Sequence, residues 1–420
     1  MVKDTIIPAS LPNIQMRLEV LSKFNSTPGE GVTRLALSPE DMAGRLYVKN
    51  EMMSIGLEVT EDAVGNIFGT LPGKDRSLAP VWTGSHLDTV RNGGQFDGMA
   101  GVICGMEALR MIRQSNLQPL RDISVVAFTS EEAARYGMGC IGSRALAGTL
   151  RLEDAETLFD ESGTSLKDQL ELLGFDVGAF PSLPRKKGDV HAMVELHIEQ
   201  GAVLERNGKS IGVVHTISAP TEMHVSVSGQ QSHAGATPMD LRRDPMPAAA
   251  TIILELESIA SSYANPSTVG TVGSLQVWPN SSNVIPSKVE FSIDIRSSNF
   301  EEKSSILEKL KALFARLEKE RGVSISYEIR CDDYPALASK EILEDIREAC
   351  TFFDYSHMDI ASGAYHDSLL VSEFAPFGMI FLPSKDGISH DRNEWTDYED
   401  LEKGTNVLAR TLWKLAGAPR

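Results

Sequence analysis

Histidine and acidic residues gather in four short runs of this 420-residue chain. These runs are SHLDT from residue 85, ELHIEQG from residue 195, SHAG from residue 232 and ISHD from residue 388. A lone histidine is more often a structural residue, but histidines clustered with carboxylates are typical of sites that hold a metal ion or move a proton. The search for chemistry therefore starts from these runs.

The first run predicts a supported metal ligand. Residues two apart on a strand share a face, so the carboxylate of Asp88 could hold the ring of His86 and fix its tautomer. Asp97 follows in the glycine-rich turn GGQFDG, where its two carboxylate oxygens could each bind one cation. The alternative for Asp97 is an ordinary turn residue that bonds nearby backbone.

Glu131 and Glu132 form a second acidic site, directly after a run of apolar, strand-like residues. Two adjacent buried acids repel each other unless a cation or a shared proton is present. A division of roles relieves the repulsion, with one glutamate binding metal and the other taking a proton from metal-bound water. The alternative is a solvated acidic helix start, which the helix dipole favours.

Further nitrogen ligands would come from His197 and His390. Three histidines and two acids form a mixed nitrogen and oxygen set, which suits Zn²⁺ or Mn²⁺. No run matches a strict metal signature such as HExxH, so the residues alone leave a two-metal hydrolase as one of several hypotheses. The predicted ligand set is His86, Asp97, Glu132, His197 and His390.

The elements that must position these residues alternate in type. Strand-like runs such as APVWTGSHLDTV and DISVVAFTSEE alternate with helix-like runs at 39–56 and 101–114. This alternation predicts an α/β domain with a largely parallel sheet. Such sheets bind ligands at the carboxyl ends of their strands, which is where His86, Asp88, Glu131 and Glu132 fall.

The pattern changes near residue 218. Strand-like runs and two helical runs, 242–262 and 300–321, follow in the order β-α-β-β-α-β of the ferredoxin-like unit. We expect the charged helix 300–321 to pack one apolar stripe on its sheet. The sequence predicts an inserted domain at 218–331 between two parts of a catalytic domain, 1–217 and 332–420, whereas residues 151–190 carry no readable pattern.

Composition argues against several classes of protein. The 40 basic and 58 acidic residues give a net charge of −18, which argues against nucleic acid as a partner. No apolar run is long enough to predict a membrane span, and the N-terminal MVKDTIIPASLPNIQ lacks the apolar stretch of a signal peptide. The four cysteines are scattered, as in a reducing compartment. We therefore expect a cytoplasmic enzyme.

Together these runs resemble the M20 metallopeptidase-like amidohydrolases, within the hydantoinase/carbamoylase subfamily. The matching runs extend from about residue 30 to the C-terminus and include GSHLDTVRNGGQFDGMAGV, FTSEEAARYG, ELHIEQGAVLE, SHAGATPMDLRRDP, SNVIPSKVEFSIDIR, YHDS and GISH. The resemblance implies a zinc-peptidase-like α/β catalytic domain with an inserted ferredoxin-like lid or dimerisation domain. It also implies a homodimer through the inserted domain, and two divalent ions per subunit, Zn or Mn, with Co or Ni possible.

The resemblance further implies roles for the residues of the predicted centre. Asp97 would bridge the two ions, with His86 and His390 on different metals. Glu131 would act as the general base, and Asp88 would support His86.

Substrate contacts are implied in the same way. His233 would stabilise the oxyanion, and Arg296 would clamp a substrate carboxylate, because its planar fork suits bidentate binding. The alternatives are that Arg296 pairs within its sheet and that Asn283 is a turn residue. The full set of predicted substrate-binding residues is Gln200, His233, Asn283, Arg296, Gly363 and His366.

One departure from the subfamily bears on the substrate. Carbamoylases usually carry Ser-Gly-Ala-Gly-His-Asp near the C-terminus, whereas this chain has SGAYHDS from residue 362. Tyr365 could narrow the pocket, and the AYHDS run looks more like ureidoglycolate amidohydrolases. We therefore expect hydrolysis of the C–N bond of a ureido or carbamoyl group on a small carboxylate. The candidates are an N-carbamoyl-L-amino acid, ureidoglycolate or allantoate, with ureidoglycolate slightly favoured.

Two other functions remain open. An M20-type aminopeptidase or dipeptidase is disfavoured by the HIEQG run, because peptidase branches usually place a carboxylate where His197 stands. A non-catalytic member of the fold is disfavoured by the full ligand set together with Glu131.

Overall fold

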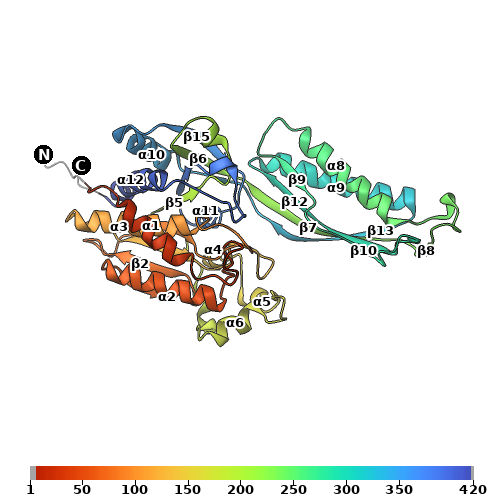
Figure 1. The fold of residues 1–420 in the computed structure, drawn as a ribbon, viewed down its shortest axis with the longest axis horizontal. Helices are drawn as coiled ribbons and strands as arrows, with labels where there is room; N and C mark the ends of the chain where they lie inside the picture. Colours follow the sequence, from red (N-terminus) through yellow and green to blue (C-terminus); the bar gives the residue numbers. More distant parts are fainter. Residues whose placement is uncertain (1–5, 418–420) are drawn as a thin grey trace. The chain divides into compact units, whose positions relative to one another are not determined.

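The computed structural model describes residues 6–417, which form two compact units (Figure 1). Unit 1 holds the residues up to His215, Leu337–Ile360 and the residues from His366 onward, and unit 2 holds Thr216–Ala336 and Ala361–Tyr365. The predicted inserted domain, 218–331, falls within unit 2. The first five residues of the N-terminal run used above lie outside the described residues.

A mixed nine-stranded sheet forms the centre of unit 1, with the order β1-β2-β4-β3-β5-β16-β6-β14 and with β15 paired to β6. The four central strands, β4, β3, β5 and β16, run parallel, whereas the pairs β1–β2, β2–β4 and β6–β16 are antiparallel. The strands are β1 (Glu58–Glu61), β2 (Ile67–Leu71), β3 (Val81–His86), β4 (Ile123–Phe128), β5 (Ala192–Ile198), β6 (Ile211–Ile217), β14 (Ala336–Leu337), β15 (His357–Ser362) and β16 (Phe377–Leu382).

Sequence explains why these four strands are central. Every residue of β3, β4, β5 and β16 is buried, and three of the strands are almost wholly apolar runs, as parallel strands covered on both faces require. Because the strands are parallel, their carboxyl ends meet at one edge of the sheet. The predicted α/β class is therefore confirmed, and the runs APVWTGSHLDTV and DISVVAFTSEE contain β3 and β4.

Helices surround the sheet of unit 1. α3 and α12 pack together against the sheet, α3 on β3, β4 and β5 and α12 on β3, β5 and β16, and α1 packs on both helices, whereas α4 and α11 form a second group that contacts β4, β5 and β16. The helices are α1 (Leu11–Leu21), α2 (Pro39–Ser54), α3 (Met99–Gln114), α4 (Ile141–Ala147), α5 (Leu152–Ala155), α6 (Leu166–Leu172), α7 (Val203–Arg206), α10 (Lys340–Phe352), α11 (Asp367–Val371) and α12 (Tyr398–Leu415), with 3-10 turns η1 (Val177–Ser182) and η3 (Lys385–Gly387).

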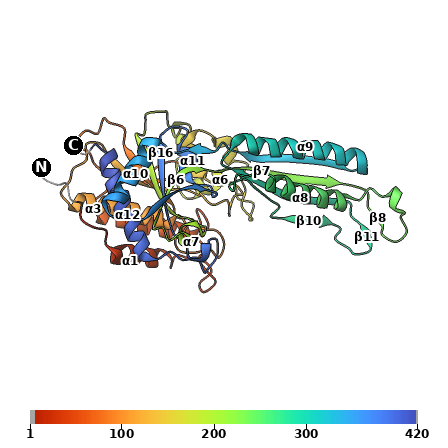
Figure 2. The same cartoon turned by 90° about the horizontal axis from the view of Figure 1, so that it is seen from above.

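Unit 2 is a smaller sandwich of helices on a sheet, in which α8 and α9 lie side by side (Figures 1 and 2). Its antiparallel sheet has the order β10-β12-β7-β13, with β9 paired to β12, which is the ferredoxin-like strand order. Its elements are β7 (Ala219–Ser228), β8 (Ser232–His233), η2 (Met239–Leu241), α8 (Pro245–Ser261), β9 (Val269–Thr271), β10 (Leu275–Trp278), β11 (Val284–Ile285), β12 (Lys288–Ser297), α9 (Phe300–Arg321) and β13 (Ser324–Asp332).

The charged helix α9 shows how local sequence sets an element of unit 2. Asn299 caps its N-terminus by accepting the backbone N–H groups of Glu301 and Glu302, and Gly322 ends it in the left-handed conformation. Its apolar stripe packs into the core of unit 2 against alternate residues of β7 and β12. As expected from its pattern, the opposite side of the helix is charged.

The segment 151–190 contains short elements, α5, α6 and η1, instead of a long helix or strand. Among the described residues, no helix is long and apolar enough to cross a membrane.

Candidate metal centre

The predicted ligands meet at the carboxyl edge of the parallel strands. His86 is the last residue of β3, His197 lies one residue before the end of β5, and Glu132 lies four residues after the end of β4. His390 is carried by the loop that follows β16. Ligands far apart in the sequence are therefore brought together because four neighbouring strands end side by side.

The first ligand group consists of His86, Asp97 and His197, all buried, with one potential ligand atom from each lying within 4.8 Å of the others. Asp97 Oδ1 is 3.1 Å from His197 Nε2 and 3.7 Å from His86 Nε2. This spacing leaves room for a cation between the two rings and the carboxylate.

The second ligand group consists of Asp97, Glu132 and His390, again with one potential ligand atom from each residue within 4.8 Å of the others. His390 Nε2 is 3.1 Å from Asp97 Oδ2 and 3.2 Å from Glu132 Oε1. Asp97 thus belongs to both groups, with Oδ1 facing the first and Oδ2 facing the second. That is the arrangement expected of a carboxylate that bridges two cations.

Backbone carbonyls set the tautomer of the two buried histidines. His86 Nδ1 donates to the carbonyl of Asp88 at 2.9 Å, and His197 Nδ1 donates to the carbonyl of Ile198 at 2.8 Å. A neutral imidazole that carries its proton on Nδ1 leaves a lone pair on Nε2. Both Nε2 atoms face Asp97, so the rings present the atom that a metal ion would bind.

Asp88 supports this site differently from the sequence-based expectation. β3 ends at His86, so the argument from alternation along a strand does not apply, and the carboxylate of Asp88 lies 3.8 Å from His86 Nδ1. The Asp88 carboxylate instead accepts the backbone N–H groups of Glu131 at 3.2 Å and Glu132 at 3.0 Å. Asp88 therefore holds His86 through its backbone and the Glu131–Glu132 turn through its side chain.

Glu131 lies inside the centre, with Oε2 3.6 Å from His86 Nε2 and only 9% of the residue exposed. Burial raises the pKa of its carboxyl well above the usual value, and the charges of Glu132, Asp367 and Asp97 add to the rise, while His86 opposes it. The weak donor Cys140 Sγ lies 3.8 Å from Oε1. Glu131 is thus a poorly solvated carboxylate next to both ligand groups.

The charges of the centre call for cations. In the part of the chain that the structure describes, the acids of the centre form ion pairs with histidines only: Asp97 with His86, His197 and His390, Glu131 with His86, and Glu132 with His390. Hydrogen bonds to Asp97 and Glu132 raise the pKa of His390 to about 11. Divalent ions would replace the protons that such a cluster otherwise holds, so the nitrogen and oxygen donors fit them.

Strained backbone surrounds the ligands. Ser130, Gln200 and His390 have φ values of 55°, 57° and 56°, which only the surrounding structure can maintain for residues with a side chain. Gly98, at φ 69°, meets the His86 ring so closely that a Cβ there would lie 2.4 Å from it. Residues in such conformations cluster at functional sites, where strain fixes a side chain in place.

Two predicted substrate residues lie beside the ligands in unit 1. Gln200 donates from Nε2 to Asp97 Oδ2 at 2.9 Å, and its own Oε1 is buried without a partner. The ring of His366 packs 4.6 Å from that of His197, and it forms a further potential ligand group with His197 and Glu195. Glu195 on β5 accepts the hydroxyl groups of Ser85 on β3 and Ser368 on α11, so it links these three elements.

The other predicted substrate residues belong to unit 2. The Nδ1 atom of His233 accepts two backbone N–H groups, both at 3.0 Å, so its neutral ring carries a proton on Nε2. Asn283 lies in the turn before β11, where Ser281 donates to its Oδ1. Arg296 forms an ion pair with Asp294, two residues away on the same strand, at 2.9 Å. In this structure Arg296 therefore pairs within its sheet, which was the alternative to a substrate contact.

The run with the unusual tyrosine lies at the boundary of the units. Gly363 has open space where a Cβ would be. The hydroxyl of Tyr365 donates to Asp333 Oδ2 at 2.6 Å, within unit 2. Tyr365 is therefore held by Asp333, the residue directly after β13, a contact that the sequence did not suggest.

Two buried acids beside the centre were missed by the sequence reasoning. Glu394 accepts the backbone N–H groups of Phe96 and Asp97. Asp367 accepts the hydroxyl of Ser143 at 2.5 Å and keeps its other oxygen buried without a partner. Burial is the main cause that raises the pKa of each carboxyl to about 7. The only signal available was their position, four residues after His390 and one after His366.

Comparison with known proteins agrees with this geometry. The model of Peptidase family M20/M25/M40 matches residues 82–414. The chain is 41% identical to N-carbamoyl-L-amino acid amidohydrolase of Geobacillus stearothermophilus, over 95% of this chain and 97% of the relative. It is 39% identical to ureidoglycolate hydrolase of Arabidopsis thaliana, over 96% and 86%, and 36% identical to allantoate amidohydrolase of Escherichia coli K12, over 96% and 97%.

Solved structures give the same answer. The structure of AtUAH in complex with (S)-hydroxyglycine superimposes with a TM-score of 0.90 at 38% identity, over 98% of this chain and 99% of that one. The predicted resemblance is confirmed by both comparisons. The chain belongs to Peptidase family M20/M25/M40.

Proposed function

We propose that this protein hydrolyses the C–N bond of a ureido or carbamoyl group on a small carboxylate substrate. The observation that carries the proposal is the sharing of Asp97 between two ligand groups with Glu131 beside them. The names of the relatives support an N-carbamoyl-L-amino acid, ureidoglycolate or allantoate as substrate. The AYHDS run slightly favours ureidoglycolate.

Two divalent ions per subunit would occupy the two ligand groups. The donors are imidazole nitrogens and carboxylate oxygens without thiolates, which suits Zn²⁺ or Mn²⁺ and allows Co²⁺ or Ni²⁺. When bound, such ions would polarise the substrate carbonyl and lower the pKa of a water molecule. A ureide needs this help because both of its nitrogens donate electrons into the carbonyl.

Glu131 would move the proton. Its carboxylate is buried, with the weak donor Cys140 Sγ 3.8 Å from Oε1, so it is more basic than an exposed glutamate. It would accept a proton from the attacking water and deliver that proton to the leaving nitrogen. Asp88 would keep Glu131 in place through the backbone N–H group that it accepts.

His233 would stabilise the oxyanion that forms on the carbonyl. Its Nδ1 accepts backbone N–H groups, which leaves Nε2–H as a donor, as this role requires. Gln200, Asn283, Gly363 and His366 would bind the substrate. Arg296 would bind the substrate carboxylate. For this, its guanidinium would either leave its ion pair with Asp294 or bind both carboxylates at once.

The proposal is tested by ammonia release from ureidoglycolate, allantoate and several N-carbamoyl-L-amino acids, with Mn²⁺ and Zn²⁺ supplied separately to the metal-free protein. Dipeptides serve as the comparison for peptidase activity. We expect turnover of at least one ureide and none of the dipeptides. Metal-loaded protein that cleaves dipeptides but no ureide would overturn the proposal.

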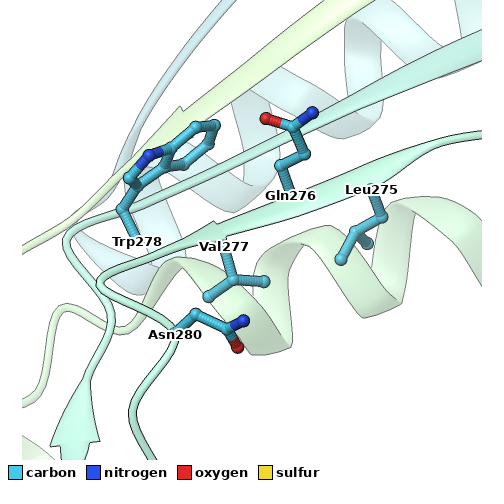
Figure 3. A pocket seen from close by; sticks show the side chains of 5 residues that line it. All are labelled: Leu275, Gln276, Val277, Trp278 and Asn280. Atoms are coloured by element: carbon cyan, nitrogen blue, oxygen red, sulfur yellow. The ribbon is translucent and has the colours of Figure 1, made fainter.

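We also propose a homodimer through unit 2, in the cytoplasm. β10 is an edge strand with exposed Leu275 and Trp278, and α8 exposes Leu254 at 65% on its outer face. Figure 3 shows the shallow pocket along β10, where Gln276 and Trp278 project to one side of the strand and Leu275 and Val277 to the other. Light scattering should give a dimer mass, and Leu254→Asp should lower it; a monomeric wild type would contradict the proposal.

A further inference from the structure

Glu394 is a buried acid that the proposed reaction does not use. The residue is 3% exposed and lies in the loop between β16 and α12 that also carries His390. Its Oε1 accepts the backbone N–H groups of Phe96 at 3.0 Å and Asp97 at 3.1 Å, and its Oε2 accepts the Ser389 hydroxyl at 2.8 Å. One carboxylate thus joins the residue before His390 to the backbone of Asp97.

The loop that carries Asp97 is shaped around this carboxylate. A Cβ added to Gly94 would lie 2.1 Å from Glu394 Oε1 and 2.4 Å from its Cβ, so no side chain fits at position 94. The loop of Glu394 is itself closed by backbone bonds from Lys385 to Trp395 and from Glu394 to Asp391. Two fixed loops therefore meet at the side chain of Glu394.

This junction matters more for one ligand group than for the other. His86 and His197 are themselves paired residues of the sheet, His86 with Phe128 of β4 and His197 with Phe381 of β16. His390 and Glu132 lie on loops beyond β16 and β4, and no strand pairing fixes His390 relative to Asp97. Apart from the ligand contacts themselves, the polar connection runs through Glu394 and Ser389, whose hydroxyl also lies 3.5 Å from Asp97 Oδ2, and the ring of Phe96 packs 5.3 Å from that of Trp395.

We propose that Glu394 is a positioning residue that sets the distance between Asp97 and His390 and thereby builds the binding site of the second cation. This inference rests on the proposed two-ion function. Glu394 would not touch the ion. It would act as partners behind metal ligands do, by fixing their orientation.

A purely structural role predicts something different. If Glu394 only satisfies buried donors, its removal leaves those donors without an acceptor and lowers stability without selecting one ion over the other. A positioning role predicts a selective loss of the second ion. Metal affinity therefore separates the two roles without any measurement of activity.

The test titrates metal-free protein with Mn²⁺ by calorimetry and confirms the stoichiometry by elemental analysis. The proteins are wild type, Glu394→Ala, Glu394→Gln, Ser389→Ala and, as matched control, Glu399→Ala at an exposed position in the first turn of α12. For Glu394→Ala we expect affinity for the second ion to fall about 10- to 100-fold, with the first ion almost unchanged. Glu394→Gln keeps an oxygen for both N–H groups and should retain most of the affinity. Glu399→Ala should match wild type.

Ser389→Ala removes only the hydrogen bond between Ser389 and Glu394, so it still tests the inference if Glu394→Ala does not fold. We expect a smaller loss of affinity for the second ion in Ser389→Ala than in Glu394→Ala. Hydrogen exchange of the peptide covering Phe96 and Asp97 should accelerate in Glu394→Ala but not in Glu399→Ala. Three results would overturn the inference. They are an unchanged affinity for the second ion in Glu394→Ala, an equal loss of affinity for both ions in that variant, and an affinity in Glu394→Gln as low as in Glu394→Ala. A wild type that binds one ion would instead refute the two-ion function, while hydrogen exchange would still test the loop junction.

Discussion

The two ligand groups share Asp97 but stand on different supports. In the first group, the histidines sit on β3 and β5, where strand pairing with β4 and β16 holds them in place. In the second group, Glu132 and His390 sit on loops, and His390 is half exposed. Strand pairing fixes a ligand without help, whereas a loop ligand depends on side chains that bind backbone N–H groups, as Asp88 and Glu394 do.

The largest effect is expected from a variant that removes the proposed base and leaves both ligand groups intact. Glu131→Gln keeps the shape of the side chain but cannot accept a proton, so kcat should fall by about 100- to 10,000-fold. Metal content, measured by elemental analysis, should stay at the wild-type value. Turnover near that of wild type would refute Glu131 as the base.

The next variants break the comparison directly. His390→Ala should lose one ion and keep the other, because the first group retains His86, Asp97 and His197. Asp97→Ala should lower the affinity for both ions, since the two carboxylate oxygens of Asp97 face different ligand groups. Stoichiometry after dialysis measures both outcomes, with Glu399→Ala as control. Equal loss of both ions in His390→Ala would show that the groups are not independent.

A smaller effect is expected at Asp88, which braces the Glu131–Glu132 turn. Asp88→Asn leaves one backbone N–H group facing an amide NH₂, so the free energy of unfolding should fall by about 1–3 kcal/mol. Urea unfolding of the metal-free protein measures this change. Because His86 is held by the backbone carbonyl of residue 88, affinity for the first ion should change less than affinity for the second.

The smallest effect is a pH dependence of the metal-free protein. Burial raises the pKa of Asp88, Asp367 and Glu394 to about 7, above the values of an unfolded chain. The folded state therefore keeps protons that the unfolded state has released, so Tm should fall as pH rises from about 5 to about 8. His390, whose pKa is raised, contributes with the same sign above its unfolded value. Calorimetry should show a weaker dependence once metal is bound; a Tm that rises with pH would contradict the assignment.

The same contrast separates what sequence can predict from what it cannot. α9 was predicted as 300–321, and β3 and β4 were found from apolar runs, because periodicity and capping residues are local signals. The ligand residues were predicted because they lie in short polar runs at strand ends. The bonds of Glu394 to Phe96 and Asp97 join loops almost 300 positions apart, and no local pattern announces them.

Other misses have a similar cause. The side chain of Asp88 was expected on His86, but the strand ends at His86, two residues before Asp88, so the alternation does not continue. The segment 151–190 was unreadable because its helices are short, and side-chain contacts tie it to the rest of unit 1, such as Gln169 on the backbone of Leu37 and Asp160 on Arg135. Arg135 lies three residues after Glu132, so this segment buttresses the same turn that Asp88 holds from inside.

The position of β16 has a consequence for biosynthesis. β16 pairs with β5 and β6 in the middle of the sheet, yet it is made after all of unit 2, and His390 follows it. A nascent chain therefore presents the buried edge of β5 until its last segment arrives, and such edges invite aggregation. The centre is also completed last, so a ribosome that stops before β16 leaves a chain with the first ligand group but without the second.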